Sequence, residues 1–163
     1  MAKKQKIDKT NAMRQLDSAG IEYEMAEYDV DESDLSGVHA AAELGVSEDE
    51  VFKTLVTRGD NNQLFVFVIP SGAELDLKKA AHASGNKKIE MIHVKEIFDL
   101  TGYIRGGCSP IGMKKQYPTL IDETAVLFEK IYFSAGKRGV QIILAPDILS
   151  EFIGADYADL TKA

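Results

Sequence analysis

The stretch "VFKTLVTRGDNNQLFVFVIP" (51–70) decides the fold. Its two arms, 51–58 and 64–70, are rich in β-branched and aromatic residues, which favour extended strands. The segment "GDNN" (59–62) separates the arms and supplies residues that favour turns. We therefore predict a β-hairpin, and the strand 51–58 has apolar side chains on both faces.

Strands and short helices alternate on either side of this hairpin. Helical patterns cover 9–20, 38–44, 74–84, 94–101 and 146–154, and strand patterns cover 21–28, 88–93 and 140–145. The segment 124–134 reads as a helical turn that becomes a strand. Interleaved elements with hairpin-like pairs predict an α+β fold on a curved mixed β-sheet, with flanking short helices.

Length and composition favour one domain spanning 1–163. The chain has 163 residues and is 45% hydrophobic, enough for a single core. We expect residues 1–8 to be disordered. No apolar run reaches the roughly 18 residues of a membrane helix, and the basic start lacks the apolar segment of a secretory signal. The single cysteine forms no internal disulfide, so we expect a cytoplasmic protein without membrane contact.

Charge is distributed unevenly along the chain. The net charge is −7, and residues 21–50 hold 11 of the 26 acidic residues with no Lys or Arg. The rest of the chain has the other 15 acidic residues against all 19 basic ones. The basic residues include doublets at 78–79, 87–88, 114–115 and 137–138. They serve solubility, or they form a cationic rim that faces phosphates; the net charge disfavours DNA binding.

Common catalytic sets are missing from the sequence. His39, His82 and His93 are scattered, so we expect no metal site and no cofactor. The segment "GCSPI" (107–111) fails the serine-hydrolase pattern, because Ile111 stands where the last glycine should be. Cys108 is either an inert thiol or a nucleophile with a stabilised thiolate.

Lys53 has two interpretations. It lies in the first arm of the hairpin among Val51, Phe52 and Leu55. Its ammonium either extends along apolar surface to water, or projects into a cleft. In a cleft it could bind a phosphate or ribose oxygen, or act with a pKa lowered by desolvation.

The glycine-rich stretch "TGYIRGGCSPIGMKK" (101–115) also has two interpretations. Gly106 and Gly107 let backbone N–H groups approach a ligand and form a nest for an anion or a carbonyl oxygen. A corner of a barrel or a β-bulge also requires glycine. The segment "SAGKRG" (134–139) repeats the pattern with two cations.

Five motifs together resemble a known family. They are "VFKTLV" (51–56), "ELDLKKAA" (74–81), "TGYIRGGCSPIGMKK" (101–115), "TLIDETA" (119–125) and "SAGKRG" (134–139). In this order and spacing they resemble the YbaK/EbsC family of aminoacyl-tRNA deacylases, in particular its Cys-tRNA(Pro) deacylases, from about residue 9 to about 160. Each motif alone is weak, and the five in order are specific.

The resemblance implies a fold and an activity. It implies one α+β domain on a curved mixed sheet or partial barrel, related to the editing insertion domain of bacterial prolyl-tRNA synthetases. It implies hydrolysis of mischarged aminoacyl-tRNA, chiefly cysteine on tRNA(Pro), at the tRNA 3′ end and beside prolyl-tRNA synthetase. In the family's proposed mechanism the cysteine thiol attacks its own carbonyl carbon and cyclises, so the protein supplies orientation and oxyanion contacts.

The resemblance also assigns site residues. It implies catalytic roles for Lys53, Gly106 and Gly107, and substrate contacts for Tyr28, Thr54, Ser109, Pro110, Ser134, Lys137 and Arg138. Three positions depart from the family's pattern: Gln141 replaces an acid, Ser36 an aromatic residue and Ala135 a glycine. The alternatives are a non-catalytic tRNA- or synthetase-binding module, a deacylase that prefers Ala-tRNA(Pro), and a thiol enzyme that uses Cys108.

Overall fold

The computed structural model describes residues 8–163, so the predicted disorder of residues 1–8 falls, except for residue 8, outside the described residues. The described chain forms eight strands: β1 (Glu24–Glu27), β2 (Val51–Arg58), β3 (Leu64–Pro70), β4 (Glu90–Met91), β5 (Thr119–Asp122), β6 (Ile131–Ser134), β7 (Val140–Leu144) and β8 (Asp156–Ala158). Its α-helices are α1 (Asn11–Ser18), α2 (Gly37–Leu44), α3 (Leu77–Ser84), α4 (Ile97–Thr101) and α5 (Pro146–Ile153). Short 3₁₀ helices cover η1 (Asp60–Asn62), η2 (Val94–Glu96) and η3 (Glu123–Leu127).

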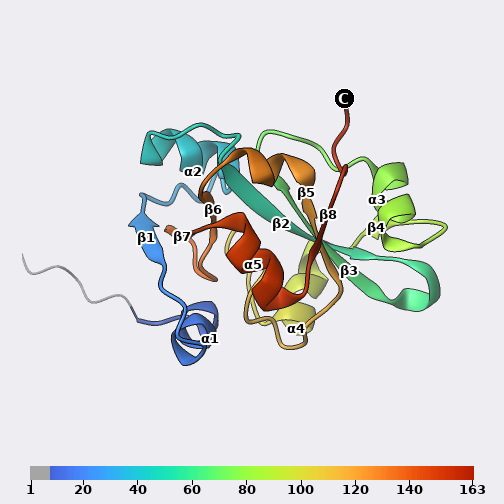
Figure 1. Ribbon diagram of the computed structural model, residues 1–163, viewed down its shortest axis with the longest axis horizontal. Helices are drawn as coiled ribbons and strands as arrows, with labels where there is room; N and C mark the ends of the chain where they lie inside the picture. The colour runs from blue at the N-terminus through green and yellow to red at the C-terminus, as the bar shows by residue number, and fades with distance from the viewer. Residues whose placement is uncertain (1–7) are drawn as a thin grey trace, which may run out of the picture.

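The strands form one mixed sheet. Their order is β1-β7-β6-β2-β3-β5-β8, and β4 pairs with β2 off this path (Figure 1). The β2–β6, β3–β5 and β5–β8 pairs are parallel, and the others are antiparallel. In the described chain β1 and β8 are edges that do not pair with each other, so the sheet stays open. The predicted α+β fold with a mixed sheet and short helices is confirmed.

The predicted hairpin is confirmed residue for residue. Strand β2 pairs with β3 from Phe52 opposite Pro70 to Arg58 opposite Leu64. The turn between them places Asn61 and Asn62 at φ values of 58° and 59°. Asparagine tolerates this left-handed region better than most residues, which explains why "GDNN" can close the hairpin.

The other edge of β2 is shared between two partners. Strand β6 pairs with β2 only at Val51 and Phe52, and β4 pairs with it only at Thr57 and Arg58. No strand of the described chain pairs with this edge over residues 53–56. The sheet therefore has a gap in its middle, beside the strand that carries Lys53.

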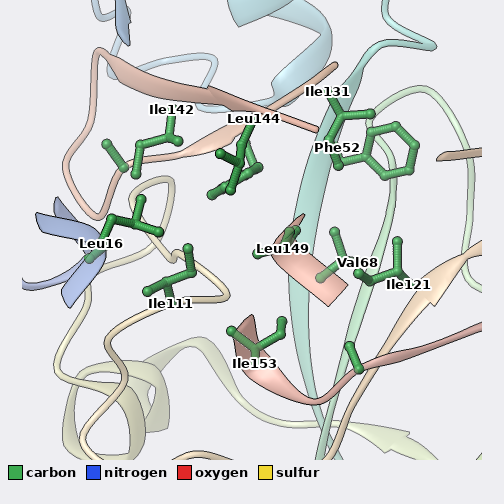
Figure 2. Close-up of a cluster of buried hydrophobic side chains, with 14 of the residues drawn as sticks. Leu16, Phe52, Val68, Ile111, Ile121, Ile131, Ile142, Leu144, Leu149 and Ile153 are labelled. Atoms are coloured by element: carbon green, nitrogen blue, oxygen red, sulfur yellow. The ribbon is translucent and has the colours of Figure 1, made fainter. Parts of the chain in front are cut away.

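Both faces of the sheet are covered. Side chains from α1, α5 and strands β2, β3, β5, β6 and β7 point into one apolar cluster (Figure 2), and α5 lies on the near side of the sheet in Figure 1. Phe67 and Ile69 of β3 point the other way and pack with Ala80 and Ala81 of α3. This two-sided burial explains the apolar residues at consecutive positions of the hairpin.

Capping residues set the helix ends. Ser36 Oγ accepts a hydrogen bond from the His39 N–H at 3.1 Å and starts α2, and Gly45 ends it at a φ of 70°. Pro146 opens α5 as expected. Among the described residues, no helix is long and apolar enough to cross a lipid bilayer.

The two neighbouring residues Leu149 and Ile148 test the core assignment. Leu149 is fully buried, whereas Ile148 is 41% exposed. We expect Leu149→Ala to lower the free energy of unfolding by about 2–5 kcal/mol, because it leaves a cavity. The matched Ile148→Ala should cost less than about 1 kcal/mol. Urea unfolding of both variants measures the difference, and equal costs would contradict the packing of α5 described above.

Candidate functional site

A cavity of about 510 Å³ opens at the gap beside β2. Most of its lining comes from residues 33–40, strand β2, residues 91–97, the glycine loop at 105–108, and the adjacent ends of β6 and β7, and Tyr28 and Ser71 complete it. Residues 51–56 all line it, including those whose side chains lie on opposite faces of the sheet. The cavity thus exists because β6 and β4 leave β2 uncovered between them.

Lys53 lines this cavity from the middle of β2. It is half-buried, and burial lowers the pKa of its ammonium below the usual 10.5, an effect that Glu74 partly opposes. No hydrogen bond or ion pair within 4 Å holds the ammonium among the residues that the structure describes. This geometry favours an ammonium that faces a ligand, because an anionic or hydroxyl oxygen would compensate its lost hydration.

Two buried polar atoms in the same cavity lack partners. Thr54 Oγ1 and Gln141 Oε1 have no hydrogen bond within the described chain, although Gln141 is only 5% exposed. A buried polar group without a partner costs about 1–3 kcal/mol. Both atoms are shielded from solvent, so a bound molecule can contact them only if the lining shifts.

The backbone of Thr54 also faces the gap. The C=O groups of Glu50 and Val56 accept hydrogen bonds from β6 and from Ile92 on that edge. Alternate residues of a strand direct their N–H and C=O groups to the same side, so those of Thr54 point toward the gap. The strand therefore offers a ligand both main-chain and side-chain groups.

The glycine loop forms one rim of the cavity. Gly106 lines the cavity with a φ of 82°, which favours glycine. The Gly107 N–H donates to the Ile104 C=O at 2.9 Å, so it is already used within the loop. A Cβ atom at Gly107 would lie 3.2 Å from the Arg138 backbone nitrogen, so Gly107 lets the glycine loop pack against residues 137–138.

The structure brings together half of the predicted site residues. Tyr28, Lys53, Thr54, Gly106 and Ser134 line the cavity. The other five, Gly107, Ser109, Pro110, Lys137 and Arg138, lie outside its lining.

Those five residues shape the loops behind the cavity. Ser109 is fully buried, and its Oγ accepts from the Ile111 N–H at 3.3 Å. Arg138 Nε donates to the Arg105 C=O at 2.8 Å, which ties the segment 134–139 to the glycine loop. Their substrate contacts stay predictions, and the geometry favours an indirect role for Ser109 and Pro110.

Sequence reasoning missed several residues of the lining. Arg105, Ser71 and Met91 line the cavity from three separate segments, and no local pattern places them together. Gln141 was noted only as a departure from a family pattern. A polar residue within the apolar strand "VQIIL" (140–144) was the available signal, because a buried strand rarely accepts an unpaired amide.

The two rims of the cavity differ in charge. On the side of α2, residues 29–36 carry Asp29, Asp31, Glu32 and Asp34 and no basic residue. On the side of the glycine loop lie Arg105, Lys137 and Arg138. The two groups adjoin each other, because a Cβ atom at Gly106 would lie 3.1 Å from Leu35 and the Tyr28 N–H donates to the Gly139 C=O at 2.9 Å. Among residues 8–163, no group of three or more His, Cys, Asp or Glu is placed to hold a metal ion.

Comparison with known proteins gives this cavity a family. The model of the aminoacyl-tRNA editing domain matches residues 35–152, which include β2, the glycine loop and the segment 134–139. The chain belongs to the aminoacyl-tRNA editing domain family. The resemblance drawn from the five sequence motifs is confirmed, and with it the expectation of an enzyme that removes amino acids from tRNA.

A relative agrees with this assignment, and two solved structures share the fold. A protein of Enterococcus faecalis named "Putative Cys-tRNA(Pro)/Cys-tRNA(Cys) deacylase EbsC" is 50% identical over 161 residues, 99% of this chain and 98% of the relative. Two solved structures share the fold at 24% identity: the hypothetical protein APE2540 (TM-score 0.85, covering 94% of this chain and 100% of that one) and a "putative trans-editing enzyme for prolyl tRNA synthetase" (TM-score 0.83, 94% and 96%).

Cys108 offers a test of the thiol-enzyme alternative. Burial raises the pKa of its thiol to about 11, although a hydrogen bond with Thr101 partly opposes this. The thiolate fraction at pH 8 is then about 0.1%, against roughly a quarter for a free cysteine of pKa near 8.5. We expect iodoacetamide to react at least about 100-fold more slowly with the folded protein than with the urea-unfolded protein.

The pH dependence of the alkylation rate reports whether the pKa of Cys108 is raised or lowered. Because the pKa is raised, the alkylation rate should climb about tenfold per pH unit up to about pH 11. A rate that levels off below pH 9 would reveal an activated thiolate. Deacylation by Cys108→Ala, measured alongside, should stay close to that of the wild type.

Proposed function

We propose that this editing enzyme removes cysteine from Cys-tRNA(Pro), and that it works in trans beside prolyl-tRNA synthetase. The observation that carries the proposal is Lys53, a half-buried ammonium without a protein partner in the described chain, in a cavity of about 510 Å³. Ligand cavities commonly span about 300–1,000 Å³, which admits a terminal adenosine with its amino acid. The 50% identity to the deacylase of E. faecalis named above supports the choice of substrate.

Different cavity residues contact different parts of the substrate. Lys53 binds a phosphate or ribose oxygen of the terminal nucleotide and fixes the position of the ester. Gln141 Oε1 is a neutral acceptor, suited to the α-ammonium of the amino acid, and Thr54 Oγ1 can donate or accept. Tyr28 and Met91 border the same space. Each buried atom that lacks a protein partner would gain one when the lining shifts to admit substrate.

The chemical step follows from holding the ester in place. The substrate thiol attacks its own carbonyl carbon, the tetrahedral oxyanion forms, and the bond to the ribose oxygen breaks. The thiol proton ends on that ribose oxygen, and the released thiolactone reacts with water to give cysteine. Orienting two groups within one molecule contributes up to about 7–11 kcal/mol.

A backbone donor for the oxyanion is available at the glycine loop. The Gly106 N–H is the candidate, because Gly106 lines the cavity and the Gly107 N–H already bonds to Ile104. Losing one such donor costs roughly 3–4 kcal/mol in serine proteases. Gly107 then supports catalysis by letting the loop pack against residues 137–138.

Selectivity has two sources in this proposal. A pocket alone separates small side chains by only about 1–3 kcal/mol, whereas a reaction that needs a thiol rejects alanine and serine more strongly. The tRNA body is read by the synthetase, since a single small domain contacts little beyond the 3′ end. The acidic segment 21–50 is a candidate surface for that partner.

The matched lysines 53 and 130 test the role of Lys53. We expect Lys53→Ala to lower kcat/KM for Cys-tRNA(Pro) by about 10- to 100-fold, the usual effect of losing a charged hydrogen bond. Lys130 bonds with Glu24 at 2.7 Å on the surface, and Lys130→Ala should change the rate by less than about threefold. Because burial lowers the pKa of Lys53, removing it should not reduce thermal stability. Near-wild-type turnover by Lys53→Ala would rule out its assigned role.

Chemically altered substrates test the thiol step. We expect tRNA(Pro) carrying S-methylcysteine to be hydrolysed at least about 100-fold more slowly than Cys-tRNA(Pro), because methylation removes the nucleophile. Ala- and Ser-tRNA(Pro) should also be poor substrates. Single-turnover deacylation compares the four esters with their uncatalysed rates. Faster loss of alanine would support the Ala-tRNA(Pro) alternative, and survival of all four esters would support a non-catalytic module.

A further inference from the structure

An exposed apolar surface adjoins the cavity where residues 91–97 line it. It consists of Met91, Val94, Phe98 and Ile104, which are 47%, 55%, 56% and 47% exposed. We call it the 91–104 surface. Met91 and Val94 also line the cavity, so the surface continues outward from the mouth of the site.

The backbone fixes the arrangement of this surface. Helices η2 and α4 run on from one another over residues 94–101, which places Val94 and Phe98 about one helical turn apart. Ile97 lines the cavity, and Thr101 Oγ1 donates to its C=O at 2.7 Å. Phe98 therefore lies on a fixed helical turn with its aromatic ring largely open to solvent.

Cations border the 91–104 surface. Lys114 Nζ lies 5.4 Å from the centre of the Phe98 ring and donates to the Asp99 C=O at 3.2 Å. Lys95 and Arg105 are exposed beside it.

The acids of the same segment are partly neutralised. Glu96 bonds with Arg58 at 3.1 Å, which leaves Asp99 as the exposed carboxylate. Against it stand Lys95, Arg105 and Lys114, so the 91–104 surface attracts a phosphate chain that leaves the cavity.

We propose that the 91–104 surface binds the single-stranded nucleotides that precede the terminal aminoacyl-adenosine of the RNA substrate. This inference rests on the proposed function, which places the terminal nucleotide in the cavity. Phe98 and Val94 provide a stacking surface for a base, and Lys95, Arg105 and Lys114 contact the phosphates. Aromatic side chains flanked by cations are the usual means of binding single strands, and they tolerate any base sequence.

Equilibrium binding of RNA hairpins tests this surface without requiring turnover. One hairpin carries a four-nucleotide single-stranded 3′ end, and a second has the same stem with a blunt end. The variants are Phe98→Ala, the conservative Phe98→Tyr, and the matched control Leu127→Ala. Leu127 is 76% exposed on η3 and does not line the cavity.

We expect Phe98→Ala to weaken binding of the overhang hairpin by about 5- to 100-fold. Phe98→Tyr should retain most of that binding, Leu127→Ala should match the wild type, and the blunt hairpin should bind weakly to all four proteins. Equal binding of the overhang hairpin by Phe98→Ala and the wild type would overturn the proposal. The proposal would also be overturned if Phe98→Ala weakened binding of both hairpins equally. It would be overturned as well if Phe98→Ala weakened binding to a synthetase but not to RNA.

Deacylation measured on the same variants separates this proposal from the proposed function. With tRNA as substrate, Phe98→Ala should raise KM and leave kcat close to that of the wild type. Lys53→Ala should lower kcat/KM. With 3′-O-cysteinyl-adenosine, which lacks the preceding nucleotides, Phe98→Ala should be as active as the wild type. Overhang binding that depends on Phe98 without any ester hydrolysis would remove the proposed function and keep the RNA surface. Hydrolysis of tRNA that depends on Lys53 but not on Phe98 would keep the proposed function and remove the RNA surface.

Discussion

Strand β2 has to serve the core and the cavity at the same time, and the rest of the structure depends on how it does so. Along one edge it pairs with β3 over seven residues, which anchors it. Along the other edge it gives two residues to β6 and two to β4. The residues between those pairs keep a free edge next to a packed core, so Lys53 and Thr54 are held rigidly yet remain open to a ligand.

The position of Lys53 and Thr54 costs folding free energy, which a bound substrate can offset. Burial disfavours the charged form of Lys53, and two polar atoms nearby lack partners in the described chain. Such groups destabilise a fold slightly. In the proposed function, a bound aminoacyl end supplies oxygens and an ammonium as partners for these groups. Sites of this kind are common where function, rather than stability, fixes a residue.

The two glycine-containing loops act as one unit. Gly107 permits close approach to the backbone at 137–138, and Arg138 bonds back to the Arg105 C=O. Together they present Gly106 to the cavity and cations to its rim. An aminoacyl ester is already activated, so a rigid site with one backbone donor and one well-placed ammonium is adequate for its cleavage. In the proposed function no strong base is required, because the attacking thiol is part of the substrate.

The sequence by itself determined the local structure and much of the chemistry. The β-branched arms and "GDNN" specified the hairpin, and capping residues such as Ser36 and Gly45 set helix ends, because these effects act over a few residues. Sequence motifs alone pointed to Lys53, Thr54 and Gly106. Strands β5 and β8 were missed because they are short and pair in parallel with residues far away in the chain. Only the tertiary structure decided that β6 and β4 stop short of each other on β2. That gap, which no local pattern encodes, brings Gln141, Arg105 and residues 91–97 around one cavity, since long-range strand pairing depends on the packing of the whole sheet.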